Sequence, residues 1–338
     1  MLRLRYRHKV RLRKVGRFLL IALGACILAG IVVLVYADSL ITYDRDGAHL
    51  NTEPTQVQGE TTAPPKDRPV ILNPIIEIQE GPVAPTNFAE VGGVYITTSM
   101  LQDMPKVMEL LQAMEEPCGV YLELKSDFGN FYYSSSFSHG NYADGVDVKA
   151  VDALIEYLKD NGFYMVAAIP AFPDRAYVLE NDSLCIREQG GYGWMDSRGC
   201  YWLDPSNDAV ISRLMQMGRE LTERGFREIC FTGFQFPDGK NLVYGSDKSR
   251  EEVIREAATE ISDHFTKSEI IVSFATDTTD FPVAGGRIFV SGVDGSQVER
   301  YAGAYGDSET CRELVFLADS KDARFDNYAL LRPLMAES

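Results

Sequence analysis

The sequence predicts an α/β fold in which a parallel sheet closes into a (β/α)8 barrel of the TIM type. First, from residue 91 onwards, short apolar strands alternate with amphipathic helices, the pattern that produces parallel sheets. Second, this alternation covers about 250 residues, the usual length of such a barrel. Third, no glycine-rich fingerprint follows a predicted strand, which disfavours the alternative, a doubly wound nucleotide-binding sheet.

Seven strands are predicted, each short, apolar and bounded by turn residues. They cover 92–98, 118–124, 163–169, 226–231, 270–275, 287–290 and 314–318. A TIM-type barrel has eight strands. We therefore expect a barrel that is either incomplete or closed by an irregular segment near the C-terminus.

Four amphipathic helices are predicted between the strands, with apolar residues recurring at helical spacing. They are centred on 107–114, 151–158, 210–221 and 253–261. Asp103 and Asp147 are expected to cap the first two helices, and Ser206 the third. Gly162 and Gly225 are typical of helix C-terminal ends, so they should end the second and third helices.

The N-terminal part predicts a membrane anchor. Residues 18–37 form a run of twenty uncharged residues, and as a helix they would span the ~30 Å hydrocarbon core of a bilayer. The arm 1–17 carries eight Lys or Arg and no acid, so the positive-inside rule keeps it in the cytoplasm. A cleaved signal peptide ending at Ala37 is the alternative, although its apolar core would normally be only about 7–15 residues.

The remaining chain is predicted to lie outside the cell. Residues 38–88, rich in Thr, Pro and Gln, should form an extended stalk, and 89–338 the barrel domain. We thus expect a single-pass protein of the cell membrane with its C-terminal domain outside. The whole chain carries −16 and the arm +8, so the rest carries −24, which argues against a nucleic-acid partner.

Cysteine and histidine usage predicts neither a metal site nor a cofactor. Five of the six cysteines lie outside the apolar run, no CxxC pair occurs, and the chain has four His. Cys185 and Cys200 flank a glycine-rich loop, and whether they form a disulfide is left open.

Acidic and aromatic residues gather after the predicted strands, where barrel enzymes build their sites. Both tryptophans, Trp194 and Trp202, lie in one nine-residue span, close to Tyr192. Paired carboxylates perform acid–base chemistry on glycosidic bonds, and aromatic rings stack on sugars. Each acid also has a structural explanation as the N-cap of a following helix. The acids after the strands are Glu123, Asp127, Asp174, Asp196, Asp204, Asp277, Asp294 and Asp319.

Residues 191–205 (GYGWMDSRGCYWLDP), then 225–229 (GFREI) and 236–237 (FP), resemble the glycoside-hydrolase-like barrel family of bacterial extracytoplasmic proteins. That family reads W-x-D-x-x-G-x-x-W-x-D-P and then G-F-D-E-I-x-F-D-Y-I-R-F-P. Residues 122–129 (LELKSDFG) resemble its strand end I-D-V-K-D-D-x-G. The resemblance covers about 92–237 and implies a barrel with a polysaccharide ligand. The candidate catalytic acids are Asp204, Asp127 and Glu123, and the candidate substrate-binding residues are Trp194, Trp202, Asp196, Asp174, Tyr192, Lys125 and Gln235.

The chain departs from the family pattern where charge is expected. Thr232 stands in place of a strand-end Asp, and Gln235 in place of an Arg. In the third strand, Ala168 and Pro173 replace an Arg and a Lys. Threonine cannot act as a carboxylate nucleophile or stabilise an oxocarbenium ion as an anion. We expect a protein that acts on or binds cell-envelope polysaccharide, with its hydrolytic activity open; the alternative is a non-catalytic carbohydrate-binding or envelope scaffold domain.

Overall fold

The structure, a computed structural model, describes residues 41–44, 47–50, 92–268, 270–281, 286–306 and 313–335. The chain divides into two compact units, 1–77 and 78–338. In the first unit, β1 (Ile41–Asp44) and β2 (Gly47–Leu50) pair in antiparallel fashion, within the range expected to form the stalk. The basic arm and the apolar run 18–37 lie outside the described residues. Among the residues that the structure does describe, no helix has the length and apolarity needed to cross a membrane.

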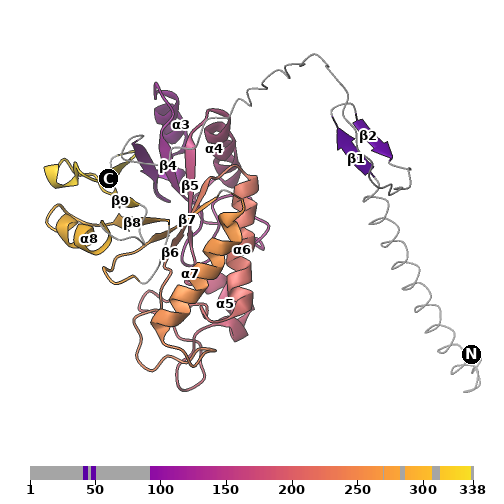
Figure 1. The fold of residues 1–338 in the computed structure, drawn as a ribbon, viewed down its shortest axis with the longest axis vertical. Coiled ribbons are helices and arrows are strands. Elements are labelled where there is room, and N and C mark those ends of the chain that lie inside the picture. The colour runs from indigo at the N-terminus through magenta and orange to yellow at the C-terminus, as the bar shows by residue number, and fades with distance from the viewer. Residues whose placement is uncertain are drawn as a thin grey trace, which may run out of the picture. The chain divides into compact units, whose positions relative to one another are not determined.

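The second unit contains a closed barrel of eight parallel strands with helices on its outside (Figure 1). Each strand pairs with the next along the chain, and the last pairs with the first. The strands are β3 (Gly93–Ile96), β4 (Gly119–Glu123), β5 (Tyr164–Pro170), β6 (Glu228–Thr232), β7 (Ile271–Ala275), β8 (Arg287–Ser291), β9 (Glu313–Leu317) and β10 (Ala329–Pro333). The predicted TIM-type barrel is therefore confirmed.

The expectation of an incomplete or irregularly closed barrel is wrong, because β10 is a regular eighth strand. Leu330 pairs with Phe316 of β9, and Arg332 pairs with Val94 of β3. The strand has only five residues and ends in a proline, which hides it from a pattern search. Pro333 is tolerated because it stands at the strand's end.

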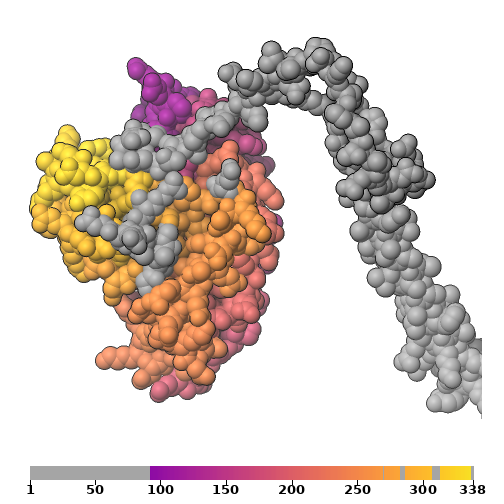
Figure 2. Space-filling model, in the orientation of Figure 1, coloured from indigo at the N-terminus to yellow at the C-terminus, as the bar shows by residue number. Residues whose placement is uncertain are grey.

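The helices are α3 (Met104–Gln112), α4 (Val148–Asp160), α5 (Arg175–Glu180), α6 (Asp208–Glu223), α7 (Arg250–Thr266) and α8 (Val298–Tyr305). In the space-filling view, α7 and the orange segments beside it form much of the face toward the viewer (Figure 2). Asp103 and Asp147 cap α3 and α4 as predicted. Ser206 does not cap α6; Asn207 does, by accepting a hydrogen bond from the backbone N–H of Ala209.

The inside of the barrel is packed. Tyr121 and Phe289 lie there with their ring centroids 5.1 Å apart, among small residues such as Ala168 and Cys230. A second apolar layer lies between the strands and the helices. A ligand therefore has room only at an end of the barrel, not along its axis.

Buried charges close the N-terminal end of the barrel. Arg287, the first residue of β8, forms ion pairs with Glu228 and, at 2.6 Å from its Nε, with Glu313. The Tyr164 hydroxyl donates a 2.8 Å hydrogen bond to Glu228, and the Ser273 hydroxyl donates another. This face of a TIM barrel generally serves stability, whereas functional sites form at the opposite face.

Candidate functional site

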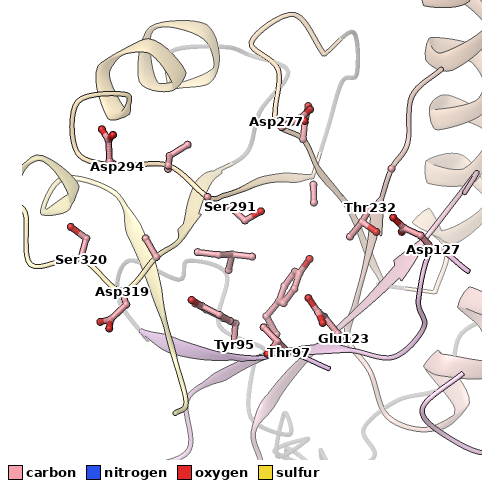
Figure 3. Close-up of a pocket in the computed structure, with 18 of the residues that line it drawn as sticks. Tyr95, Thr97, Glu123, Asp127, Thr232, Asp277, Ser291, Asp294, Asp319 and Ser320 are labelled. Carbon is pink, nitrogen blue, oxygen red and sulfur yellow. The ribbon is translucent and has the colours of Figure 1, made fainter. Parts of the chain in front are cut away.

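A cavity with a volume of about 1160 Å³ lies at the carboxyl ends of the strands. Figure 3 shows Glu123, Asp127 and Thr232 on one side of it and Asp294 and Asp319 on the other. It is the position at which TIM-barrel sites form. Its charged lining residues are Glu123, Asp127, Asp277, Asp294, Asp319 and Asp322, with Arg198 and Arg324.

Glu123 is held in a fixed position at the cavity wall. It is the last residue of β4, and its Oε2 accepts hydrogen bonds from the backbone N–H (2.7 Å) and hydroxyl (2.9 Å) of Thr98. Thr98 follows the neighbouring strand β3, so two adjacent strand ends together orient this carboxylate. The predicted position of Glu123 in the site is thus the one observed.

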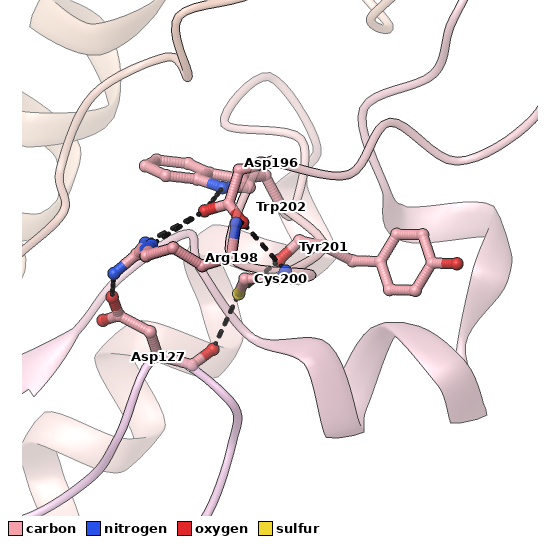
Figure 4. A network of polar contacts seen from close by, with 6 residues as sticks. All are labelled: Asp127, Asp196, Arg198, Cys200, Tyr201 and Trp202. Carbon is pink, nitrogen blue, oxygen red and sulfur yellow. Dashed lines mark hydrogen bonds and ion pairs between the residues drawn. The ribbon is translucent and has the colours of Figure 1, made fainter.

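Asp127 lies in the same wall and joins a network of polar contacts (Figure 4). Arg198 Nη1 lies 2.6 Å from Asp127 Oδ2, and its Nη2 lies 3.0 Å from Asp196 Oδ2. Asp196 also accepts hydrogen bonds from the backbone N–H of Cys200 (2.9 Å) and from the indole N–H of Trp202 (3.3 Å). Asp196 therefore fixes the loop and does not itself line the cavity.

The network also sets the acidity of Asp196. Burial by itself raises the pKa of this carboxyl, but the hydrogen bonds from Cys200, Arg198 and Trp202 outweigh burial and lower the pKa below its ordinary value. Asp196 is thus ionised under ordinary conditions and suited to holding Arg198 and the Trp202 indole. A proton donor would need the opposite shift.

Of the two tryptophans, only Trp202 lines the cavity; it is 6% exposed. Trp194 packs near Gly239, where an added Cβ would lie 2.9 Å from the indole nitrogen. Tyr192 is 77% exposed and does not line the cavity either. Of the three aromatic residues predicted to bind substrate, Trp202 therefore lines the cavity, whereas Trp194 and Tyr192 do not.

Asp204 lies outside the cavity. Its carboxylate accepts hydrogen bonds from the backbone N–H (2.9 Å) and hydroxyl (2.7 Å) of Ser206 and from the backbone N–H of Gly245 (2.7 Å). These contacts join two loops that are far apart in sequence. Asp204, predicted as a catalytic acid, therefore holds these loops together away from the cavity.

Lys125 and Asp174 form a buried ion pair of 3.0 Å that also lies outside the cavity lining. Asp174 caps α5 by accepting a hydrogen bond from the backbone N–H of Tyr177. The pair packs under Gly129 (φ +88°), where an added Cβ would lie 2.3 Å from Asp174 Oδ1. Glycine is needed there both for its backbone conformation and for this close approach.

The two departures from the family pattern at β6 both line the cavity. Thr232 ends β6, and Gln235 follows three residues later. Gln235, predicted to bind substrate, thus lines the cavity. The uncharged Thr232 stands near Glu123 and Asp127 in Figure 3.

Three charged residues of the cavity were neither candidates nor among the acids predicted to follow the strands. Arg198 falls within the motif but is only recognisable as a site residue once its ion pair with Asp127 is seen. Asp322 and Arg324 lie in or beside the 3-10 helix Ala323–Phe325 after β9. The hydrogen bonds from Arg324 lower the pKa of Asp322 to about 2. A search restricted to the first residues after each strand misses this turn.

Cys185 and Cys200 are free thiols and form no disulfide. Cys200 Sγ donates to the backbone oxygen of Asp127 (3.0 Å), and Cys185 Sγ to that of Asp182 (3.1 Å). Burial, followed by the charges of Asp127 and Asp196, raises the pKa of Cys200 to about 12. Within the described ranges, no group of three or more His, Cys, Asp or Glu residues is arranged to hold a metal ion.

The closed parallel barrel presents carboxylates and an indole at its strand ends, and these are residue types that sugar chemistry uses. The family described as "Putative glycosyl hydrolase domain" matches residues 93–280, more than half of the chain, and the chain belongs to this family. The predicted family is therefore confirmed, and with it a glycan-related function.

Solved structures with a similar fold include a hypothetical protein from Ruminiclostridium thermocellum (22% identity, TM-score 0.45). The match covers 54% of this chain and 96% of that protein. Another is the exo-β-N-acetylglucosaminidase of Vibrio harveyi (8% identity, TM-score 0.49; 68% of this chain, 41% of that one). A third is the chitobiase of Flavobacterium johnsoniae (14% identity, TM-score 0.43; 67% and 37%). The chain thus spans about two fifths of the two sugar-cleaving proteins. No curated protein matches it.

Proposed function

We propose that the protein binds a polysaccharide of the cell envelope in the cavity at the barrel mouth. The observation that carries this proposal is the cavity of about 1160 Å³ at the strand ends of a glycosyl-hydrolase family barrel. Small-molecule sites usually measure about 300–1,000 Å³, so the volume suits several sugar rings. Trp202 offers an apolar edge, and Glu123 and Gln235 offer hydrogen-bonding groups.

Binding without efficient hydrolysis is the form of this function that the site supports best. Canonical hydrolysis requires two carboxyls on either side of the scissile bond. Glu123 and Asp127 both belong to the segment at the end of β4, and Asp127 is already paired with Arg198. At the end of β6, the position expected to carry Asp holds Thr232. The reactive carboxylate expected of that strand is therefore missing.

Hydrolysis by a different pair is the second candidate. Glu123 is oriented by Thr98, and Asp319 lies across the cavity (Figure 3). In this candidate, Glu123 protonates the leaving oxygen and Asp319 acts from the opposite side of the sugar. Under this mechanism, Glu123→Gln should abolish hydrolysis.

Binding and cleavage are separated by one experiment on the full-length protein. Labelled peptidoglycan and neutral oligosaccharides are tested for retention on the immobilised protein and for new reducing ends. We expect retention without cleavage, lost in Trp202→Leu and kept in Trp194→Leu, because only Trp202 lines the cavity. Reducing ends that disappear in Glu123→Gln would favour the hydrolase, and equal binding by both tryptophan variants would reject the barrel mouth as the site.

We further propose that residues 18–37 anchor the protein in the cell membrane, with the barrel outside. The support is the uncharged run and the eight basic residues before it. Protease added to intact cells should degrade the barrel while sparing an N-terminal tag. A barrel that resists protease until the cells are lysed would contradict this orientation.

A further inference from the structure

A second cavity, of about 530 Å³, lies away from the barrel mouth. It is formed by the loop at 137–139, by α5 and by α6, and it shares no lining residue with the first cavity. Its wall includes Phe137, His139, Tyr177, Glu180, Arg213 and Gln216. Neither the resemblance nor the proposed function gives it a role.

Arg213, on α6, is the notable residue of this cavity because it is a buried cation without a counter-ion. Its side chain is enclosed by two rings: the guanidinium carbon lies 3.6 Å from the ring centroid of Tyr177 and 5.4 Å from that of Phe137. The residue is only 8% exposed. Within the described part of the chain, no Asp or Glu forms an ion pair with it.

The hydrogen bonds of this guanidinium are also incomplete. Nη2 donates a long 3.4 Å bond to the backbone oxygen of Phe137, and the buried Nε has no hydrogen-bond partner. Burial lowers the pKa of Arg213 from its ordinary value, while the charges of Asp174, Tyr177 and Glu180 and a hydrogen bond with Tyr177 act in the other direction. Buried charges in proteins are normally paired, because taking an unpaired charge out of water is unfavourable. The Arg213 guanidinium thus lines the cavity with its charge unpaired and its hydrogen bonds incomplete.

Other polar groups of the cavity bear on what would bind. Gln216, one helical turn after Arg213, and Asn181 at the end of α5 both carry amide donors. Glu180 is the opposing charge, but its Oε2 lies 3.2 Å from His139 Nδ1, so it is engaged elsewhere in the cavity. The aromatic faces of Phe137 and Tyr177 are already covered by Arg213, which leaves little apolar surface.

We propose that this second cavity binds a small oxyanion, a carboxylate or a phosphate group, with Arg213 as its counter-ion and Gln216 as a further donor. Guanidinium groups match the planar geometry of carboxylates and the oxygens of phosphate. The anion can come from a uronic acid of a glycan or from a phosphate group. Both sources present the same chemistry to Arg213.

The test uses the full-length protein with sodium phosphate, sodium glucuronate and, as a neutral comparison, glucose. Calorimetric titration should show binding of at least one of the two anions and none of glucose. Tighter binding of glucuronate would identify a uronic acid as the source, and tighter binding of phosphate a phosphate group. No binding of either anion would overturn the proposal.

Three variants test the site itself. Gln216→Glu places a negative charge one turn from Arg213 on an exposed helical position, so anion affinity should fall at least tenfold with the fold intact. Arg213→Gln should abolish binding. Arg219→Gln, on the same helix but outside the cavity, is the matched control and should bind as the unaltered protein does. Equal affinity in Gln216→Glu and Arg219→Gln would refute the site even if Arg213→Gln failed to fold.

Thermal unfolding distinguishes a binding role of Arg213 from a purely structural one. Phosphate or glucuronate at about ten times its Kd should raise the Tm by a few degrees in the unaltered protein and in Arg219→Gln, but not in Gln216→Glu. If the Tm of the unaltered protein and of Gln216→Glu rises equally, the anion acts elsewhere and the proposal fails.

Discussion

Arg198 Nη1 and Asp127 Oδ2 lie 2.6 Å apart, although the two residues are 71 positions apart in the chain. This ion pair joins the segment after β4 to the loop that carries Trp202. Because Arg198 also holds Asp196, and Asp196 accepts the indole N–H of Trp202, the orientation of Trp202 depends on the pairing with Asp127 (Figure 4). The motif thus positions Trp202 in the cavity wall through side-chain contacts between the loop and the segment after β4.

Arg198→Gln should weaken binding of neutral oligosaccharides about three- to tenfold, because the loop that holds Trp202 loses its tie to Asp127. The free energy of unfolding should fall by no more than about 1 kcal/mol, since the guanidinium is half exposed. Titration calorimetry and urea unfolding measure the two quantities. Arg187→Gln, which removes an ion pair with Asp182 outside the cavity, is the control and should leave binding unchanged.

The positions of the cavity carboxylates could be predicted from the sequence, but their roles could not. Glu123 is the last residue of β4, and Asp277 and Asp319 lie two residues after β7 and β9, so the strand pattern alone places them at one end of the barrel. Asp174 and Asp204 follow the same rule in sequence but lie in a long loop, where they accept backbone hydrogen bonds. Residue type cannot distinguish these uses, because an aspartate that caps a helix and one that faces a ligand have the same local pattern.

Thr232→Asp should introduce or raise hydrolysis of the bound polysaccharide, because it returns a carboxylate to the strand end beside Glu123 and Asp127. Released reducing ends measure this directly, and the gain should disappear in the double variant Thr232→Asp, Glu123→Gln. Thr259→Asp, on the exposed face of α7, is the matched control and should gain nothing. Unchanged binding with no new reducing ends would show that Thr232 is not what limits catalysis.

Seven strands could be predicted from their apolar patterns, and the eighth could not. The five residues Ala329–Pro333 follow a 3-10 helix and include an arginine and a terminal proline, so they resemble a tail. Only the free edges of β3 and β9 show that a strand must stand there. Closure of a barrel is a property of the whole sheet, and no local window of sequence contains it.

Glu228→Ala should destabilise the barrel strongly, by about 3–5 kcal/mol, because it leaves the fully buried Arg287 with one partner fewer. Arg287→Met in the same chain should recover part of this loss. Urea unfolding of the single and double variants gives the coupling free energy. Glu251→Ala, which breaks an exposed pair with Arg255, should cost less than about 1 kcal/mol. If Glu228→Ala and Glu251→Ala lower the free energy of unfolding by similar amounts, the buried cluster has no special stabilising role.

The barrel mouth should prefer neutral or cationic glycans to anionic ones. Six carboxylates line the cavity, and its two arginines are already paired with Asp127 and Asp322. In competition with a labelled neutral oligosaccharide, a chitosan fragment should bind better than a uronic acid oligomer, with the difference shrinking as salt is added. Asp277→Asn should reduce the difference about two- to fivefold, whereas Asp263→Asn, on α7, should not. Tighter binding of the uronic acid oligomer would contradict this electrostatic selection.

The loop that carries both tryptophans should open in acid. The pKa of Asp196 is lowered in the folded protein, so its stabilising contacts are complete above about pH 4, the ordinary range of an aspartate, and are lost as the pH falls through the lowered value. In a Trp194→Phe background, the fluorescence emission of Trp202 should shift to longer wavelength only as the pH falls below about 4. Asp196→Asn in the same background should show the shifted emission already at neutral pH. Asp263→Asn should behave as the background does. An emission that stays constant down to the onset of global unfolding would mean that Asp196 does not control the indole.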